Sequence, residues 1–340
     1  ESGRYSSKGL QLHNFPRKCM PDPDEVIADF VDQIVPEDMV DYYGMPMIDI
    51  LSGILRPALV GDFLVSDWSA IEGRVAPWLC DTDLGDAKVQ LYADDAPVYE
   101  LAAAATFRVP VEEVTADQRQ IGKVQELSFQ YQGGAGAFLA MARNYGLKAT
   151  ESEANRYKDA WRRANPWAVK IWADIERAVI KALKKPEEMI KVGRLTYFSV
   201  ENILVGGKTL FCQLPCGRLL TYPDTRVEMV DGKFGPKQQI TVMRSAFTPK
   251  AGEKEWPRTS VYGGKLFNNA VQGTAASLMR EAVYECYIRD LPVVFHVHDE
   301  LVLDGHGHAE ALHEIMNTTP EWAAGLPLKA EVDTMKRFGK

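Results

Sequence analysis

The stretch VVFHVHDELVLD, residues 293–304, decides how the chain folds. Two apolar runs, 293–297 and 301–303, flank the acidic pair Asp299-Glu300. A short polar interruption between two such runs is typical of a tight β-hairpin. The pattern therefore predicts an antiparallel hairpin over 293–304 that carries Asp299 at its tip.

A second acid follows an apolar run far away in the sequence. Residues 63–65, Phe-Leu-Val, form a buried-strand pattern that ends at Asp67, and apolar residues then recur at helical spacing from Ile71 to Leu79. Asp67 and Asp299 are thus both expected at the rim of a sheet, although either one alone also fits an ordinary turn. Because an unpaired buried carboxylate is costly, a cation is expected between them. Mg²⁺ suits such a pair, since it takes few carboxylates and fills its shell with water and phosphates.

A capped helix is predicted from residue 116 onward. Thr115 stands three residues ahead of Gln118, which is the pattern of a capping box. The helix should run to about Tyr131 and stop before Gly133-Gly134.

This helix carries a stripe of side chains spaced by four residues: Arg119, Lys123, Leu127 and Tyr131. At 1.5 Å rise per residue, Tyr131 lies about 18 Å along the axis from Arg119, roughly the extent of a nucleoside triphosphate. Two cations could bind phosphates and the aromatic ring could support a base. An ordinary amphipathic helix with solvated cations is the alternative.

The remaining pattern is mixed. Residues 1–60 read as irregular with one helix near 23–34. Further helices are expected over 98–107, 150–185 and 264–287, and β-structure begins after residue 193. The chain is therefore predicted to be an α/β (α+β) protein.

Composition places the chain among ordinary globular proteins. It has 340 residues, 46% hydrophobic and 25% charged, with a net charge of −8. No stretch approaches the ~18 apolar residues of a membrane span, so a soluble protein without a membrane partner is expected. The five scattered cysteines favour a reducing cytoplasm. Cys212 and Cys216 could form half of a zinc site, but hairpin positions explain them better.

Residues 141–194 form a basic segment within this acidic chain. It contains thirteen Lys and Arg against seven acids, with Trp161, Trp167 and Trp172 interleaved. A solvated helix pair and a surface for nucleic acid or a partner both fit this composition.

Five blocks of sequence together resemble the family A (polymerase I-like) DNA polymerases, and their wording is most similar to bacteriophage members. SDWSAIEGRV (66–75) resembles motif A of that family, RQIGKVQELSFQYQGG (119–134) motif B and VHDELVL (297–303) motif C. SGRYSSKGLQLHNFPR (2–17) resembles the block before motif A, and YGGKLFNNAVQGTAASL (262–278) the Gln-Gly helix before motif C. The blocks stand in the family's order and span nearly the whole chain.

The resemblance implies a right-hand polymerase fold with palm and fingers. An antiparallel palm sheet, backed by helices, would come from residues 1–78 and 261–340. A mostly helical fingers region would span 79–260, including the basic segment and β-hairpins. The thumb and 3′–5′ exonuclease lie outside this sequence, so a separate chain or missing segment is expected to supply them. The implied location is the cytoplasm of a phage-infected bacterial host.

The resemblance also implies a two-metal mechanism of DNA synthesis from dNTPs. Asp67 and Asp299 would bind two Mg²⁺ ions, for which Mn²⁺ could substitute, with the backbone carbonyl of Trp68 as a further ligand. Glu300 would support the metals, and Lys123 would donate to the departing pyrophosphate.

Substrate contacts are implied in the same way. Arg119 and Lys123 would hold the triphosphate, with Leu127, Tyr131, Glu72 and Tyr99 around the nucleotide. Contacts to primer-template DNA would come from Arg4, Asn268, Asn269, Gln272 and His298, which would read acceptors common to all correct pairs.

Several positions depart from the family pattern. Leu127 replaces an aromatic residue, Tyr99 a His, Gln132 a Gly, and Gly264 an Arg for which Lys265 could substitute. These departures put sugar discrimination and phosphate binding in doubt, but they remove no metal ligand.

Two other functions are weighed against polymerisation. One is a metal-dependent hydrolase built on His296, His298 and Asp299, with His306, His308 and His313 as further ligands. Strand alternation argues against it, because the first two share a face from which Asp299 turns away. The other is a catalytically weak or inert palm-fingers module that binds nucleic acid and needs a partner chain.

Overall fold

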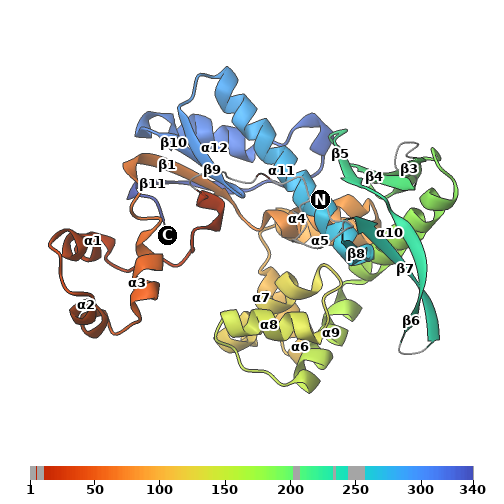
Figure 1. Ribbon diagram of the computed structural model, residues 1–340, viewed down its shortest axis with the longest axis horizontal. Helices are drawn as coiled ribbons and strands as arrows, with labels where there is room; N and C mark the ends of the chain where they lie inside the picture. The colour runs from red at the N-terminus through yellow and green to blue at the C-terminus, as the bar shows by residue number, and fades with distance from the viewer. Residues whose placement is uncertain (1–4, 6–10, 202–206, 233–234, 244–256, 340) are drawn as a thin grey trace. The chain divides into compact units, whose positions relative to one another are not determined.

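The computed structural model describes residues 5, 11–201, 207–232, 235–243 and 257–339 (Figure 1). Two compact units share the chain. Unit 2 comprises Arg4–Ser69, Ala276–Thr318 and Leu328–Lys340, and unit 1 includes Ala70–Ala275 and Thr319–Pro327. Every strand pairing in the described residues is antiparallel, in keeping with the α/β prediction.

A four-stranded sheet forms the centre of unit 2. Its strands lie in the order β11 (Ala330–Arg337), β1 (Val60–Trp68), β10 (Glu300–Asp304) and β9 (Val293–Val297). The predicted hairpin over 293–304 is confirmed, because β9 and β10 pair across a two-residue turn. The central strand β1 is buried from Phe63 to Ser66, as a strand flanked on both edges should be.

Helix α12 (Ala309–Asn317) packs against β1 and β11. The Trp68 indole N–H donates to the carbonyl of Met316 at 2.6 Å, which joins the end of β1 to this helix. A cluster of Phe63, Val65, Val297, Val302 and Phe338 fills a core of the sheet.

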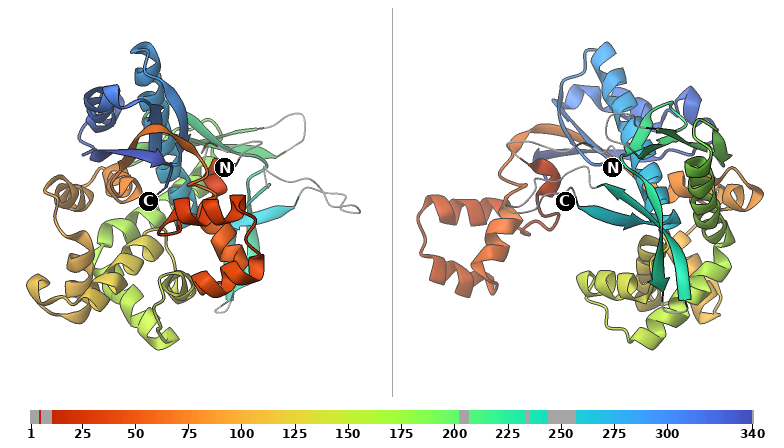
Figure 2. Two further views of the ribbon diagram at one scale, coloured as in Figure 1. Left: turned by 90° about the vertical axis from the view of Figure 1, so that its left-hand side faces the viewer. Right: turned by 45° about the vertical axis from the view of Figure 1, so that its right-hand side comes forward.

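Three short helices precede β1: α1 (Pro23–Val31), α2 (Pro36–Tyr43) and α3 (Met47–Ile54) (Figure 2). They share a small core of Met20, Val26, Met39 and Ile50. The prediction of a single helix in residues 1–60 is therefore wrong. Pro36 occupies the first turn of α2 and Pro46 the N-cap of α3, where proline begins a helix instead of breaking one.

Helices dominate the first half of unit 1. They are α4 (Ile71–Cys80), α5 (Asp83–Ala93), α6 (Val98–Phe107), α7 (Ala116–Phe129), α8 (Ala135–Asn144), α9 (Glu151–Ala164) and α10 (Pro166–Lys184). The capping box of Thr115 and Gln118 is confirmed, and α7 ends two residues before the predicted Tyr131. Helix α11 (Gly263–Ile288) begins in unit 1 and ends in unit 2.

Two small sheets follow these helices. The first contains β2 (Ile190–Val192), β3 (Leu195–Glu201), β4 (Lys208–Gln213) and β5 (Leu219–Tyr222). The second contains β6 (Arg226–Gly232), β7 (Gly235–Met243) and β8 (Arg258–Val261), with β6 and β7 forming a long hairpin (Figure 2). Cys212 lies on β4 and Cys216 in the turn before β5, so both are hairpin residues as predicted.

The tryptophans of the basic segment belong to the core of unit 1. Trp161, Trp167 and Trp172 are each at most 3% exposed, and Trp161 stacks on Trp172. Their indole N–H groups donate to Glu126, Asn165 and the carbonyl of Gln130. These rings therefore pack the protein and are not available to stack on bases.

No helix among the described residues has both the length and the apolar character that a bilayer crossing requires.

Candidate functional site

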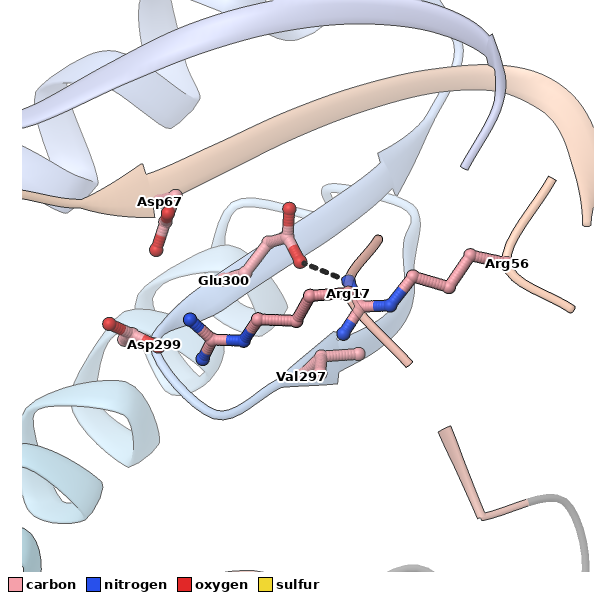
Figure 3. Close-up of a pocket in the computed structure, with 6 residues that line it drawn as sticks. All are labelled: Arg17, Arg56, Asp67, Val297, Asp299 and Glu300. Carbon is pink, nitrogen blue, oxygen red and sulfur yellow. Dashed lines mark ion pairs between the residues drawn. The ribbon is translucent and has the colours of Figure 1, made fainter. Parts of the chain in front are cut away.

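Three carboxylates, from β1 and from the β9–β10 hairpin, line one cavity of unit 2 (Figure 3). Asp67 comes from β1, Asp299 from the turn between β9 and β10, and Glu300 from the start of β10. Asp67 lies directly opposite Glu300 in the strand register, and the Trp68 N–H donates to the Asp299 carbonyl at 3.3 Å. Pairing of β1 with the hairpin thus brings together the two acids that the sequence singled out.

The cavity has a volume of about 240 Å³ and also contains two arginines, Arg17 and Arg56. Figure 3 shows Arg17 extending toward Asp299 and the Arg56 guanidinium beside Glu300. Neither arginine was assigned a role from the sequence. Arg17 stands in the block that resembles the family, whereas nothing in the local pattern around Arg56 marks it.

Arg56 is held by several contacts of unit 2. Its Nη1 lies 3.7 Å from Glu300 Oε2, and the two side chains are only 8% and 13% exposed. Its Nη2 donates to the Phe15 carbonyl at 3.5 Å, and its guanidinium lies 5.2 Å from the centre of the Phe338 ring. The cavity therefore contains a fixed positive charge beside its third carboxylate.

The carboxylate set fits the divalent ion that the family implies. Among the described residues, no group of three or more His, Cys, Asp or Glu is arranged to bind a metal. Mg²⁺ in phosphate-transfer sites is usually bound through one or two carboxylates plus substrate phosphates, instead of a complete protein cage. Asp67 and Asp299 on one open cavity match that pattern.

His296 on β9 and His298 in the following turn both pack against His13. His296 contacts the rings of Tyr5 and His13 at 4.5 and 5.2 Å, and the His298 ring lies 5.1 Å from His13. His298 has a positive φ of 57° in the turn, and its Nε2 lies 3.1 Å from the His13 carbonyl. The histidines on which the alternative hydrolase was built are thus in ring contact with Tyr5 and His13.

We expect His296 to make the fold sensitive to acid. Burial, then the neighbouring His13 and His298, lower the pKa of His296 from 6.5 to about 4, and its Nδ1 is buried without a hydrogen-bond partner. Between about pH 6.5 and 4 the unfolded chain therefore binds more protons, so stability falls as the pH falls through that window. Urea midpoints at pH 7.5, 5.5 and 4.5 should show a shallower acid loss in His296→Phe than in the wild type; equal slopes would contradict the assignment.

The predicted stripe on α7 is partly exposed, with its cations set against aromatic rings. Arg119 Nε donates to Glu100 Oε1 at 2.6 Å, and its guanidinium lies 5.6 Å from the Tyr99 ring centre. Lys123 lies 5.1 Å from the Tyr145 ring centre. Leu127 is 41% exposed on the same helix. Tyr99, which replaces the family's His, is thus in contact with Arg119.

Tyr131 lies just beyond the end of α7. Its hydroxyl donates to Glu72 Oε2 at 2.8 Å, and its ring lies 6.3 Å from that of Phe267. The Glu72 carbonyl in turn accepts from the Gln130 side chain at 3.1 Å. Two residues that the resemblance places around the nucleotide, Glu72 and Tyr131, are thereby joined within unit 1.

The two neighbouring asparagines of helix α11, Asn268 and Asn269, have different environments. Asn269 is buried and its Nδ2 donates to the Tyr222 hydroxyl at 3.2 Å. Asn268 and Gln272, four residues apart, lie half-buried on the same face, together with Lys265. Of the residues expected to contact DNA from this helix, Asn268 and Gln272 are partly exposed, whereas Asn269 is buried and bonded within the protein. Arg4 lies outside the described residues.

Two departures from the family pattern meet in the structure. Gln132 has a positive φ of 65°, and its Oε1 accepts from the Gly264 N–H at 2.9 Å, in the first turn of α11. A Cβ on Gly264 would lie 2.4 Å from the Gln132 Cβ and 2.4 Å from the Tyr131 carbonyl oxygen. An arginine at position 264 therefore has no room beside Gln132.

Gly264→Ala is expected to destabilise unit 1. The new Cβ would clash with the Tyr131 carbonyl oxygen, a backbone atom that cannot move without shifting the chain. Forced overpacking costs typically ~1–3 kcal/mol. The urea midpoint should fall by a corresponding amount, with Gly136→Ala as the control, because nothing lies within 4 Å of a Cβ there. An unchanged midpoint in the first variant would mean that the contact relaxes freely.

The charges of the basic segment have different environments. Arg162 donates to the Gly133 carbonyl at 3.1 Å and lies over the Trp172 ring, so it supports the turn after α7. Lys181 and Lys185 form ion pairs with Glu188. Arg163 lines a cavity.

Comparison with known proteins shows which proteins the chain resembles in sequence and in fold. No protein-family model matches the sequence. A DNA polymerase of Bacillus phage SP02 is 36% identical over an alignment of 340 positions that covers 97% of this chain and 49% of the phage protein. DNA polymerase I of Pseudomonas aeruginosa is 29% identical over 247 residues, 71% of this chain and 20% of that protein. The chain thus spans about half the length of the phage relative.

The fold is similar to that of a solved polymerase domain. The POL domain of Pol1 from M. smegmatis, in complex with DNA primer-template and dNTP, matches 99% of this chain and 46% of its own, with a TM-score of 0.57 and 17% identity. The motifs, the paired acids and the shared fold agree. The chain is a relative of the polymerase I-like (family A) DNA polymerases and has the fold of part of their polymerase domain.

Proposed function

We propose that this chain is the palm and fingers part of a template-directed DNA polymerase, which adds deoxynucleotides to a primer 3′-hydroxyl. The observation that carries the proposal is the meeting of Asp67 and Asp299 on one cavity, in a chain related to a phage DNA polymerase. The implied setting is DNA replication in the cytoplasm of a phage-infected host. A partner chain or further segment would supply thumb and proofreading.

The palm residues would hold the catalytic ions. Asp67 and Asp299, with the Trp68 carbonyl, are the proposed ligands of two Mg²⁺ ions, for which Mn²⁺ could substitute. Bound there, the ions would activate the 3′-hydroxyl and stabilise charge on the leaving pyrophosphate. Glu300 would be kept in place by Arg56, its buried ion-pair partner.

The residues of unit 1 would bind the substrates. Arg119 and Lys123 would contact the triphosphate, and the Lys123 ammonium would donate a proton or hydrogen bond to pyrophosphate as it leaves. The hydrogen-bonded pair of Tyr131 and Glu72 would limit space near the sugar. Primer-template contacts are proposed for the face of α11 that holds Asn268 and Gln272, with His298 and Arg4 as further contacts.

Primer extension tests the proposal directly. With dNTPs, Mg²⁺ and a labelled primer on a longer template, the full chain should lengthen the primer only when the template is present. DNA binding without extension would favour the inert module. Phosphoester hydrolysis without a template would favour a hydrolase.

Lys123→Ala should weaken catalysis without unfolding the protein, because the Lys123 side chain is only partly buried. Removing one charge-stabilising donor typically costs about 10²–10³-fold in rate. We expect kcat/KM for dNTP to fall by that amount in single-nucleotide incorporation. Lys170→Ala, on the exposed face of α10, is the matched control and should match the wild type. If Lys123→Ala incorporated nucleotides as fast as Lys170→Ala, Lys123 would have no role in the reaction.

A further inference from the structure

A second, larger cavity lies within unit 1, where the end of α6 packs against α9. Its volume is about 570 Å³, within the range of small-molecule and nucleotide sites. Arginines line it from both helices: Arg108 follows α6, and Arg156 and Arg163 lie on α9. No role was given to this place by the polymerase motifs.

The acids in the cavity wall are engaged by other groups. Glu153 Oε2 accepts from the Thr150 N–H at 2.8 Å and from the Thr150 hydroxyl at 2.7 Å, and these bonds lower the pKa of Glu153. Asp159 lies 3.4 Å from Lys158. Arg156 forms an ion pair with Glu153 Oε1 at 4.0 Å, whereas Arg108 and Arg163 form none across the part of the chain that the structure describes. Three arginines against two carboxylates leave the cavity with a net positive charge.

An aromatic wall accompanies these charges. Tyr157 lines the cavity half-buried, and its ring is held 5.8 Å from that of Phe107 and 5.4 Å from that of Phe138. The Tyr157 carbonyl accepts from the Gln125 side chain at 3.3 Å, which ties this turn of α9 to α7. The ring is thus fixed in place and does not need to be ordered when a ligand binds.

We propose that this cavity binds single-stranded DNA, with phosphates on the three arginines and a base against Tyr157. The inference rests on the proposed function. Positive charge beside an aromatic ring is the combination that single-strand binding uses. Arg156 and Arg163 are about 10 Å apart along α9, which spreads charge along the cavity as a run of phosphates requires. Paired bases are stacked inside a duplex and could not reach the ring.

Fluorescence anisotropy with labelled dT12 tests this binding in the full-length chain. The variant Arg108→Ala/Arg156→Ala/Arg163→Ala should bind dT12 about tenfold more weakly. The slope of log K against log salt should become shallower by about 2, as expected when three phosphate contacts on a single strand are lost. The matched control Lys170→Ala/Arg177→Ala/Lys181→Ala removes the same charge from exposed positions on α10 and should bind like the wild type.

Two further measurements separate the outcomes. Extension of a primer-template with a one-nucleotide overhang should be the same in the variant and the wild type, so loss of extension in both would refute the proposed function and leave the dT12 result standing. Equal dT12 affinity in the variant and the wild type, or an equal loss in the control, would overturn the proposal. If pyrophosphate, but not dT12, protected the three arginines from chemical modification, the proposal would also be overturned.

Discussion

Asp67→Asn should abolish primer extension while leaving the fold and DNA affinity intact. The substitution keeps the shape of the side chain but removes the negative charge from one of the two aspartates that line the cavity. Divalent ions contribute several kcal/mol to such reactions, and each ~1.4 kcal/mol is tenfold in rate, so extension should slow by about 10³-fold or more. Asp299→Asn should behave in the same way.

The control for this experiment lies on the β9–β10 hairpin that also carries Asp299. Asp304 is exposed at the far end of β10 and does not line the cavity, so Asp304→Asn should extend primers normally. Rates are measured by rapid quench at saturating dNTP, and primer-template affinity by anisotropy at fixed salt. Retained extension in Asp67→Asn would remove this aspartate from the catalytic centre, and with it the main support for the proposed reaction.

Arg56→Ala is expected to destabilise unit 2 strongly. It would remove the Arg56 partner of Glu300, which is only 13% exposed, and would take the guanidinium from the Phe338 ring. Breaking one side of a buried ion pair costs about 3–5 kcal/mol. The urea midpoint should fall sharply with an unchanged m-value.

Neutralising the partner distinguishes charge from packing. In Arg56→Gln/Glu300→Gln both groups are uncharged, and much of the stability should return relative to Arg56→Gln alone. Arg56→Lys should recover part of it, since the charge remains and the planar contact with Phe338 is lost. If the double variant were as unstable as the single one, the ion pair would not be the source of the effect.

The sequence predicted the parts of the fold that depend on local patterns. The hairpin over 293–304, the capped start of α7 and the long helix α11 follow from apolar periodicity and capping residues, and the structure confirms them. Helices α2 and α3 were missed because Pro36 and Pro46 resemble breaks in a short-range pattern. Whether a proline begins or ends a helix depends on whether the residues after it pack against a core, and the local sequence pattern does not show this.

In the candidate site, too, the residues that stand out in a local pattern were predicted, and those whose role depends on distant partners were not. Asp67 and Asp299 were found because each interrupts an apolar run. Arg56 was missed because its significance comes from Glu300 and Phe338, which are far away in the sequence. The tryptophans at 161, 167 and 172 were ambiguous for a related reason, since spacing alone does not tell a buried indole from a base-stacking one.

The contact between Gln132 and Gly264 has a consequence for how this protein can change over time. Each residue departs from the family pattern in its own motif. The Gln132 side chain, however, occupies the space that a side chain at position 264 would need. A bacterial-type arginine introduced at 264 should be tolerated only in a background where 132 has already become glycine and the neighbouring backbone has shifted. The two positions should therefore be inherited as a pair, and chimaeras that exchange only one of the two motifs should fail at this junction.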